Sequence, residues 1–232
     1  LFGTDWVGRD MLTRTIKGLS LSMKIGLLAT LTSTIIAIIL GIIGPTFGRR
    51  VDAVVTWFID LVLSVPHTLV VILISIAMGG GLKGIVVGVA ATHWTSLTRV
   101  IRAEVMQIME SDYTKISKNF GKSNWYIAKE HILPHVIPQI IVNAVLIFPH
   151  AILHEASVTF LGFGLPPHEP AIGVILSESM KYLTSGYWWL AFFPGLSLIL
   201  VSMMVDKIGK NYDTIKKEYL YLVSNLKIDN LK

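Results

Sequence analysis

The chain has 232 residues, of which 53% are hydrophobic and 15% are charged, with a formal net charge of +5 at pH 7. Its mean hydropathy of +0.64 is far above that of an ordinary water-soluble domain and indicates a membrane protein. The sequence has no cysteine, which excludes a disulfide framework, a thiolate metal site and a cysteine nucleophile.

Clustered apolar runs predict an all-α integral membrane protein with a single transmembrane domain. Each run approaches or exceeds the roughly 20 residues that cross the hydrocarbon core as a helix. The second run contains Pro66, which should break its helix. The five expected spans cover residues 19–44, 53–78, 85–101, 136–154 and 188–208.

The distribution of Lys and Arg predicts which loops face the cytoplasm. These residues gather after the first span, after the third span and in the tail, and cytoplasmic loops retain positive charge. Counting spans then places residues 1–18 outside, although that segment also carries Arg9, Arg14 and Lys17. A further span upstream of Leu1 would explain this conflict. We therefore expect an external segment (1–18), spans with short loops (19–110), a cytoplasmic segment (111–134), spans around an external loop (135–208, loop 155–187) and a basic cytoplasmic tail (209–232).

The segment 111–134 is too polar to cross a membrane. Ser111 and Asp112 are candidate helix N-caps, Gly121 suits a helix end, and a second short helix should end at Pro134. Two short helices hinged at a glycine predict a docking platform on the cytoplasmic surface. An ordinary amphipathic connector is the alternative.

A few ionisable residues are expected at membrane depth, where they are costly and are candidates for function. Asp60 and His67 flank Pro66, and His93 lies in the third expected span. For each of these residues, a hydrogen bond between helices is the simpler interpretation.

The stretch from His150 to Glu155 carries the strongest candidate for a metal contact. His150 and His154 are four residues apart, so a helix would place both imidazoles on one face, and neutral imidazole suits Ni, Cu, Zn and Co. Glu155 adds a carboxylate. Two imidazoles are too few for tight binding, so we expect no tight metal site, and helix packing or a hydrogen-bonded gate is the alternative role.

Other classes of function fit the sequence less well. The fragment Gly121 to Ser123 lacks the earlier glycine and the preceding strand of a phosphate-binding loop. The basic residues lie between spans and beside anionic lipid, which favours lipid over nucleic acid as their partner. An intramembrane metalloenzyme would need His150, His154 and Glu155 to hold its metal, but the H-E-x-x-H order is absent. No selectivity-filter repeat of an ion channel is visible.

Three stretches resemble the permeases of ABC importers. Gly121, nine residues and then His-Ile-Leu-Pro at 131–134 resemble the back half of the EAA signature of these permeases. The stretches GTDWVGRDMLTR at 3–14 and FLGFGLPP at 160–167 resemble the dipeptide, oligopeptide and nickel family, second-permease type. The H-x-x-x-H spacing before the second stretch resembles the nickel-like branch. At the Glu-Ala-Ala positions, however, this chain has Lys115, Ile116 and Ser117.

The resemblance implies a type I importer transmembrane domain with six spans, the first before Gly3, in a prokaryotic cytoplasmic membrane. It implies half of a translocation pathway for nickel, other metal ions or metal chelates, with dipeptides or oligopeptides as the alternative. The implied partners are a second permease, two cytoplasmic ATP-binding subunits and an extracellular solute-binding protein. The chain itself should bind no cofactor and catalyse no reaction, because the partner subunits use ATP and Mg²⁺. The residues expected in the ATPase-coupling loop are Asp112, Tyr113, Lys115, Ser117, Gly121, His131, Leu133 and Pro134.

Overall fold

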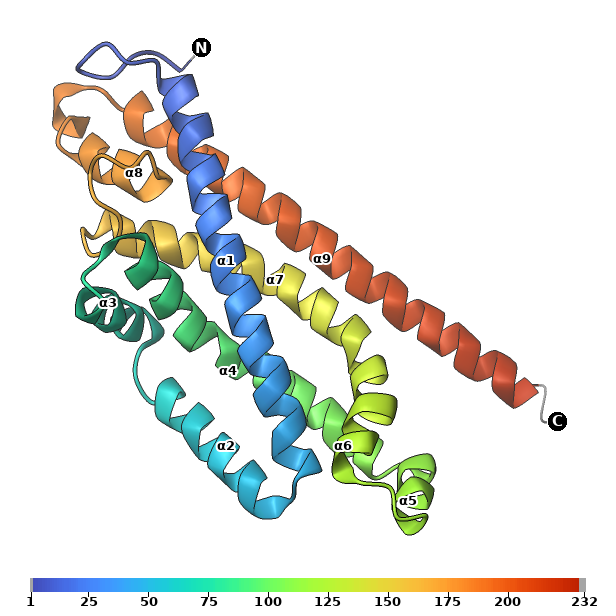
Figure 1. The fold of residues 1–232 in the computed structure, drawn as a ribbon. Helices are drawn as coiled ribbons and strands as arrows, with labels where there is room; N and C mark the ends of the chain where they lie inside the picture. Colours follow the sequence, from blue (N-terminus) through green and yellow to red (C-terminus); the bar gives the residue numbers. More distant parts are fainter. Residues whose placement is uncertain (1, 230–232) are drawn as a thin grey trace.

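The computed structural model describes residues 2–229, and the side chains of residues 2–215 (Figure 1). Apart from one isolated bridge between Thr4 and Asp10, the regular structure in this part of the chain is helical. Three long helices form the centre, namely α1 (Met11–Thr46), α4 (Gly81–Met109) and α7 (Leu133–Phe160). The helix α9 (Trp189–Asp229) packs on α7.

The helix α1 packs against α4 and α7 through a face of small side chains. Asp10 caps its first turn by accepting a hydrogen bond from the Thr13 N–H at 2.8 Å. The buried positions Gly26, Ala29 and Ser33 recur at helical spacing, which lets neighbouring helices approach closely. The opposite face exposes large aliphatic side chains, as expected of a lipid-facing surface: Leu27, Leu28, Leu31, Ile35 and Ile39.

The second expected span is two helices rather than one. The helix α2 (Arg49–Leu63) ends just before Pro66, and α3 (His67–Ala77) begins just after it. The break at Pro66 is confirmed, but the two helix axes are bent by 91°, which is the geometry of a broken span or of a re-entrant segment.

The expectation of five spans is wrong. By length and composition, three helices in the described residues could cross a membrane, or four if the bent pair counts as one span. Those three are residues Met11–Thr46, Asn124–Phe160 and Trp189–Ile215. The expected span 85–101 is helical, but it lies in α4, whose buried face carries Thr92, His93, Thr95 and Thr98. The hydroxyls of the three threonines donate to carbonyls within the helix. The helix α4 therefore buries polar groups that lower its hydropathy.

The two ends of the molecule carry different short elements (Figure 1). At one end, the α1–α2 turn lies near α5 (Asp112–Asn119), α6 (Asn124–Ile127) and the π-helix η1 (Ala128–Ile132). At the opposite end, the N-terminal segment lies beside α8 (Ile172–Met180) and the 3₁₀-helix η2 (Leu183–Ser185). The α1–α2 turn, with Arg49 and Arg50, and the basic segment 111–134 were expected to share one side of the membrane, and they lie at the same end of the molecule (Figure 1).

Candidate functional site

Three histidines from three different helices meet inside the helical bundle. His67 is the first residue of α3, His93 lies in the middle of α4, and His154 lies in α7. One ring nitrogen from each histidine lies within 4.8 Å of the other two. The ring centroids are 4.4 Å apart for His67 and His154, 4.7 Å for His67 and His93, and 5.2 Å for His93 and His154. We call these three residues the histidine cluster.

Hydrogen bonding orients one ring of the histidine cluster. The Nδ1 atom of His93 lies 3.1 Å from the carbonyl oxygen of Val89. Because a carbonyl oxygen can only accept, this contact assigns the hydrogen to Nδ1 and leaves the lone pair on Nε2 free. His93 is 7% exposed, whereas His67 and His154 are half-buried. The Nδ1 atom of His67 is buried and has no hydrogen-bond partner in the described part of the chain.

Glycines on α4 allow α3 to approach closely enough to build the cluster. A Cβ at Gly88 would lie 2.9 Å from the Val71 carbonyl oxygen, and one at Gly84 would lie 2.8 Å from that of Ser75. These distances are too short for a side chain, so α3 and α4 are in backbone contact here. The contact fixes the start of α3, and therefore His67, beside His93.

Of the pair expected from the sequence, His154 joins the histidine cluster and His150 does not. His150 is exposed and lies outside the histidine cluster, although it is only one helical turn from His154. Glu155 is fully buried, and its Oε1 accepts a hydrogen bond from the Thr159 hydroxyl at 2.9 Å. Asp60 also lies apart, because it forms an exposed ion pair with Arg99 at 2.8 Å.

The segment 111–134 forms a compact pair of short helices. The helix α5 follows its N-cap Ser111, and the chain then turns at Gly121, whose φ of +75° suits glycine. The hydroxyl of Ser117 lies 2.9 Å from Nε2 of His131, so a hydrogen bond joins α5 to η1. The Tyr113 ring packs against His131, with centroids 5.7 Å apart. These contacts hold both halves of the segment in one orientation.

This segment presents apolar side chains outward, and we call Ile116, Phe120 and Trp125 the coupling surface. Phe120 is 80% exposed and Trp125 is 67% exposed. The unexpected base Lys115 lies 3.1 Å from Glu110 of the same chain in an exposed ion pair. Leu133 and Pro134 open α7, and Leu133 packs against the buried apolar cluster behind the segment. The segment is thus anchored on one side and exposes Phe120 and Trp125 on the other.

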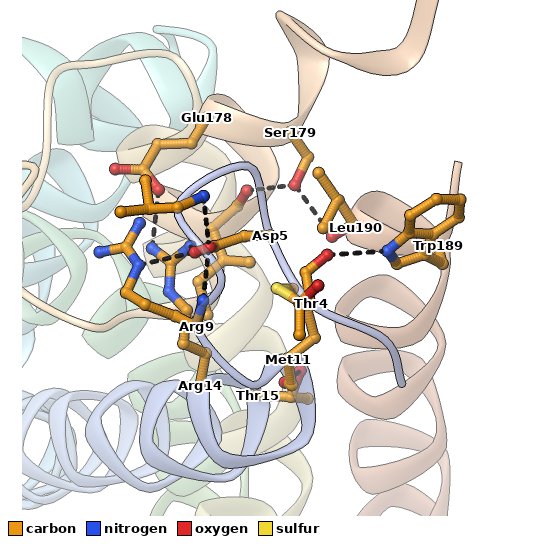
Figure 2. A network of polar contacts seen from close by, with 12 residues as sticks. Thr4, Asp5, Arg9, Met11, Arg14, Thr15, Glu178, Ser179, Trp189 and Leu190 are labelled. Atoms are coloured by element: carbon orange, nitrogen blue, oxygen red, sulfur yellow. Dashed lines mark hydrogen bonds and ion pairs between the residues drawn. The ribbon is translucent and has the colours of Figure 1, made fainter. Parts of the chain in front are cut away.

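The N-terminal segment is clamped to the opposite end of the molecule (Figure 2). The buried Asp5 carboxylate accepts hydrogen bonds from the Val7 N–H at 2.9 Å and the Arg9 N–H at 2.8 Å. It also pairs with the Arg9 and Arg14 guanidinium groups, at 2.6 and 3.1 Å. Burial alone would raise the pKa of Asp5, but the hydrogen bonds from Arg9 and Val7 outweigh it and hold the pKa below its ordinary value.

Arg14 and Trp189 extend the clamp to distant parts of the chain. Arg14 pairs with Glu178 of α8 at 2.7 Å, and the Trp189 indole N–H donates to the Thr4 carbonyl at 3.1 Å (Figure 2). The sequence marked this stretch only by its resemblance to a permease family. A buried acid followed by arginines four and nine positions later was the available signal for a local ion-pair network.

The fold is that of the membrane subunits of ABC transporters. The chain is similar to a chain of the MetNI methionine ABC transporter in inward-facing conformations, with a TM-score of 0.70, 14% identity, and coverage of 87% of this chain and 95% of that one. It is also similar to a chain of an amino acid ABC transporter with histidines, with a TM-score of 0.65, 15% identity, and coverage of 89% and 98%. At such identities the likeness concerns the all-helical fold alone.

Residues 33–214 match the family of binding-protein-dependent transport system inner membrane components, and the chain belongs to that family. It is 35% identical over 208 residues to the dipeptide transport system permease protein DppC of Bacillus subtilis, covering 90% of this chain and 65% of that protein. It is 34% identical over 208 residues to the protein of the same name from Alkalihalophilus pseudofirmus, covering 90% and 68%. The chain is thus a multi-pass, non-catalytic permease component of a bacterial inner membrane.

Proposed function

We propose that this chain is one of two permease subunits of an ATP-driven importer for dipeptides or short oligopeptides. The observation that supports this solute class is the 35% and 34% identity to two dipeptide transport permeases. The sequence alone favoured the nickel-like branch, and these relatives support its peptide alternative instead. Because the chain spans 65% of the Bacillus subtilis relative, the solute and the partners of the whole protein are part of this proposal.

In this proposal the coupling surface binds a cytoplasmic ATPase subunit. Exposed aromatic side chains such as Phe120 and Trp125 are costly in water and are the residues that most often anchor protein interfaces. The ATPase supplies ATP and Mg²⁺ chemistry, so this chain needs no cofactor of its own. A second permease completes the pathway, and a solute-binding protein delivers the peptide at the end that carries the N-terminal clamp.

Reconstituted transport tests the solute class. The chain, its partner permease, the two ATPases and the binding protein are placed in proteoliposomes, and uptake of a radiolabelled dipeptide is compared with uptake of ⁶³Ni²⁺. We expect dipeptide uptake that requires ATP and stops when the ATPase cannot hydrolyse it. Uptake of the metal ion without uptake of any peptide would overturn the peptide assignment, and uptake without ATP would overturn the importer.

A substitution on the coupling surface tests the docking step. Phe120→Ala should weaken binding of the ATPase about 30-fold, because truncating an aromatic anchor costs about 2 kcal/mol. Phe163→Ala is the matched control, since Phe163 is an exposed aromatic residue of the external loop. Equal ATPase affinity in the two variants would show that the ATPase docks elsewhere.

Import of metal ions or metal chelates is the second candidate, and one observation favours it. The histidine cluster lies among three helices of the membrane domain, with His67 and His154 only half-buried. The ⁶³Ni²⁺ arm of the uptake experiment measures this candidate directly.

A further inference from the structure

We propose that His67, His93 and His154 together bind one divalent first-row transition-metal ion, of the Zn²⁺, Ni²⁺ or Cu²⁺ kind. Imidazole nitrogen is a preferred ligand of these ions, and oxygen-preferring Mg²⁺ and Ca²⁺ would bind poorly to it. The proposal concerns binding to this chain. It goes beyond the proposed function and does not depend on which solute the importer carries.

The spacing of the three ring nitrogens suits a single ion. In a tetrahedral site with bonds of about 2.0–2.1 Å, neighbouring ligand nitrogens lie about 3.4 Å apart. Because the present separations are all within 4.8 Å, each needs to close by at most about 1.4 Å. The half-buried rings of His67 and His154 can make that adjustment by side-chain rotation.

The hydrogen bonds of the cluster leave ligand atoms available. His93 is oriented by the Val89 carbonyl in the way that metal-binding histidines are commonly oriented, through the ring nitrogen that does not face the metal. In His67, the buried Nδ1 has no partner in the described part of the chain, and an unpaired buried polar atom is destabilising. A bound ion would provide a partner within the cluster.

Ring packing alone does not explain these features. The His93 ring meets both other rings edge to face, at 76° and 79°, and aromatic residues could make the same contacts without any nitrogen. Phenylalanine at position 67 would also avoid burying an unpaired polar atom. The choice of three imidazoles, from three helices, is better explained by a shared ligand.

Three protein ligands leave at least one coordination position open, which is the arrangement of exchangeable rather than permanently closed metal sites. Among the residues that the structure describes, no carboxylate joins the cluster: Glu155 bonds to Thr159, and Asp60 pairs with Arg99. The bound ion would therefore keep its full positive charge. Such a charge is costly in a membrane interior, which favours moderate affinity and the partly open side formed by His67 and His154.

The experiment measures metal bound to the full complex in lipid nanodiscs. After treatment with a chelator and addition of Zn²⁺ or Ni²⁺, equilibrium dialysis with elemental analysis should give one ion per copy of this chain. X-ray absorption of the Ni²⁺ form should show three imidazole ligands. Binding of no ion, or a spectrum without imidazole ligands, would overturn the proposal.

Substitutions locate the site. His67→Phe and His154→Phe keep aromatic rings in the cluster but remove ligands, and each should weaken binding at least about 100-fold, more than loss of an outer hydrogen-bond partner usually does. His150 and His168 lie outside the cluster, so the variants His150→Ala and His168→Ala should bind the ion as the parent protein does. Parent-like binding by both Phe variants would overturn the site, and so would loss of binding in His150→Ala. Because His67 and His154 are only half-buried, these variants test the proposal even if substitution of His93 prevents folding.

Dipeptide uptake is measured in the same preparations. If the complex imports dipeptides and binds no metal, only the metal site is wrong. If the complex binds one ion per chain but imports no peptide, the metal site stands and the proposed solute class fails.

Discussion

Arg14 and Glu178 form an ion pair, with Nη2 and Oε2 2.7 Å apart, although 164 positions of sequence separate them. Arg14 also contacts the buried Asp5, so one guanidinium joins the N-terminal segment to α8. The side chains of Arg14 and Glu178 are 13% and 23% exposed, so removing one partner would leave a largely buried charge without its counter-charge.

Loss of Arg14 should therefore destabilise the protein. Arg14→Leu leaves the Asp5 carboxylate buried with fewer partners, a change that costs about 3 kcal/mol and should lower the melting temperature by at least about 5 °C. Arg99→Leu removes one member of an exposed ion pair instead, and this change should shift the melting temperature by less than about 2 °C. A thermal unfolding assay in detergent measures both. Similar shifts in the two variants would contradict a special role for the clamp.

Acid should release the N-terminal clamp. Because the folded-state pKa of Asp5 is lowered below 3.8, its contribution to stability is complete above about pH 4 and is lost as the pH falls through the folded-state value. Amide hydrogen exchange of the backbone N–H groups of Val7 and Arg9 should therefore accelerate below pH 4, after correction for the intrinsic rate. In Asp5→Asn, which has no charge to lose, corrected exchange should be fast throughout and should show no such transition.

Gly88 should tolerate no side chain. In Gly88→Ala the added methyl would meet the Val71 carbonyl, so α3 must move away from α4. We expect the free energy of unfolding to fall by about 1–3 kcal/mol and metal binding to weaken. Gly195→Ala is the matched control, because a Cβ there meets only the Leu176 side chain at an ordinary 3.7 Å. Thermal unfolding and dialysis with Zn²⁺ test both, and unchanged stability in Gly88→Ala would contradict the close helix contact.

Gly121→Pro should uncouple transport from ATP hydrolysis. Proline cannot adopt the φ of +75° found here, and it removes the N–H that donates to the Lys118 carbonyl at 2.9 Å. The turn between α5 and α6 should therefore reshape while the membrane helices still insert. Solute-stimulated ATP hydrolysis in the reconstituted complex should disappear, whereas normal membrane yield is expected. Gly8→Pro is the control, because Gly8 also has a positive φ but lies in the N-terminal clamp. Its solute-stimulated ATP hydrolysis should stay closer to normal.

Local features of the fold were predictable because their causes lie within a few residues. Pro66 separates α2 from α3 because proline removes a backbone N–H and disfavours a helical residue before it, and Gly121 has the positive φ that suits glycine in a turn. The start of α1 was placed too late for a different reason. Met11 is fully buried against α8, so tertiary packing extends the helix beyond its apolar run.

The histidine cluster was not predictable from spacing. His93 follows His67 by 26 positions and His154 follows His93 by 61, and each interval crosses from one helix to another, so helical periodicity does not relate the three residues. Only the H-x-x-x-H pair was visible locally, and it indicated His154, which lies in the cluster, together with His150, which lies outside it. Similarly, the polar face of α4 could be recognised as buried only once α1 and α3 were packed against it.

The helix α4 is continuous, so it can connect the histidine cluster to α5 mechanically. From His93 to Met109 the helix rises about 24 Å, and α5 starts three residues after its end. If α4 pivots as a rigid rod near its outer end, a shift of about 2 Å at the cytoplasmic surface corresponds to a rotation of only a few degrees. Such a rotation would turn the His93 ring relative to α3 and α7. Movement of an ATPase against α5 and a change of geometry around an ion bound to the histidine cluster would then be coupled through the rotation of one helix.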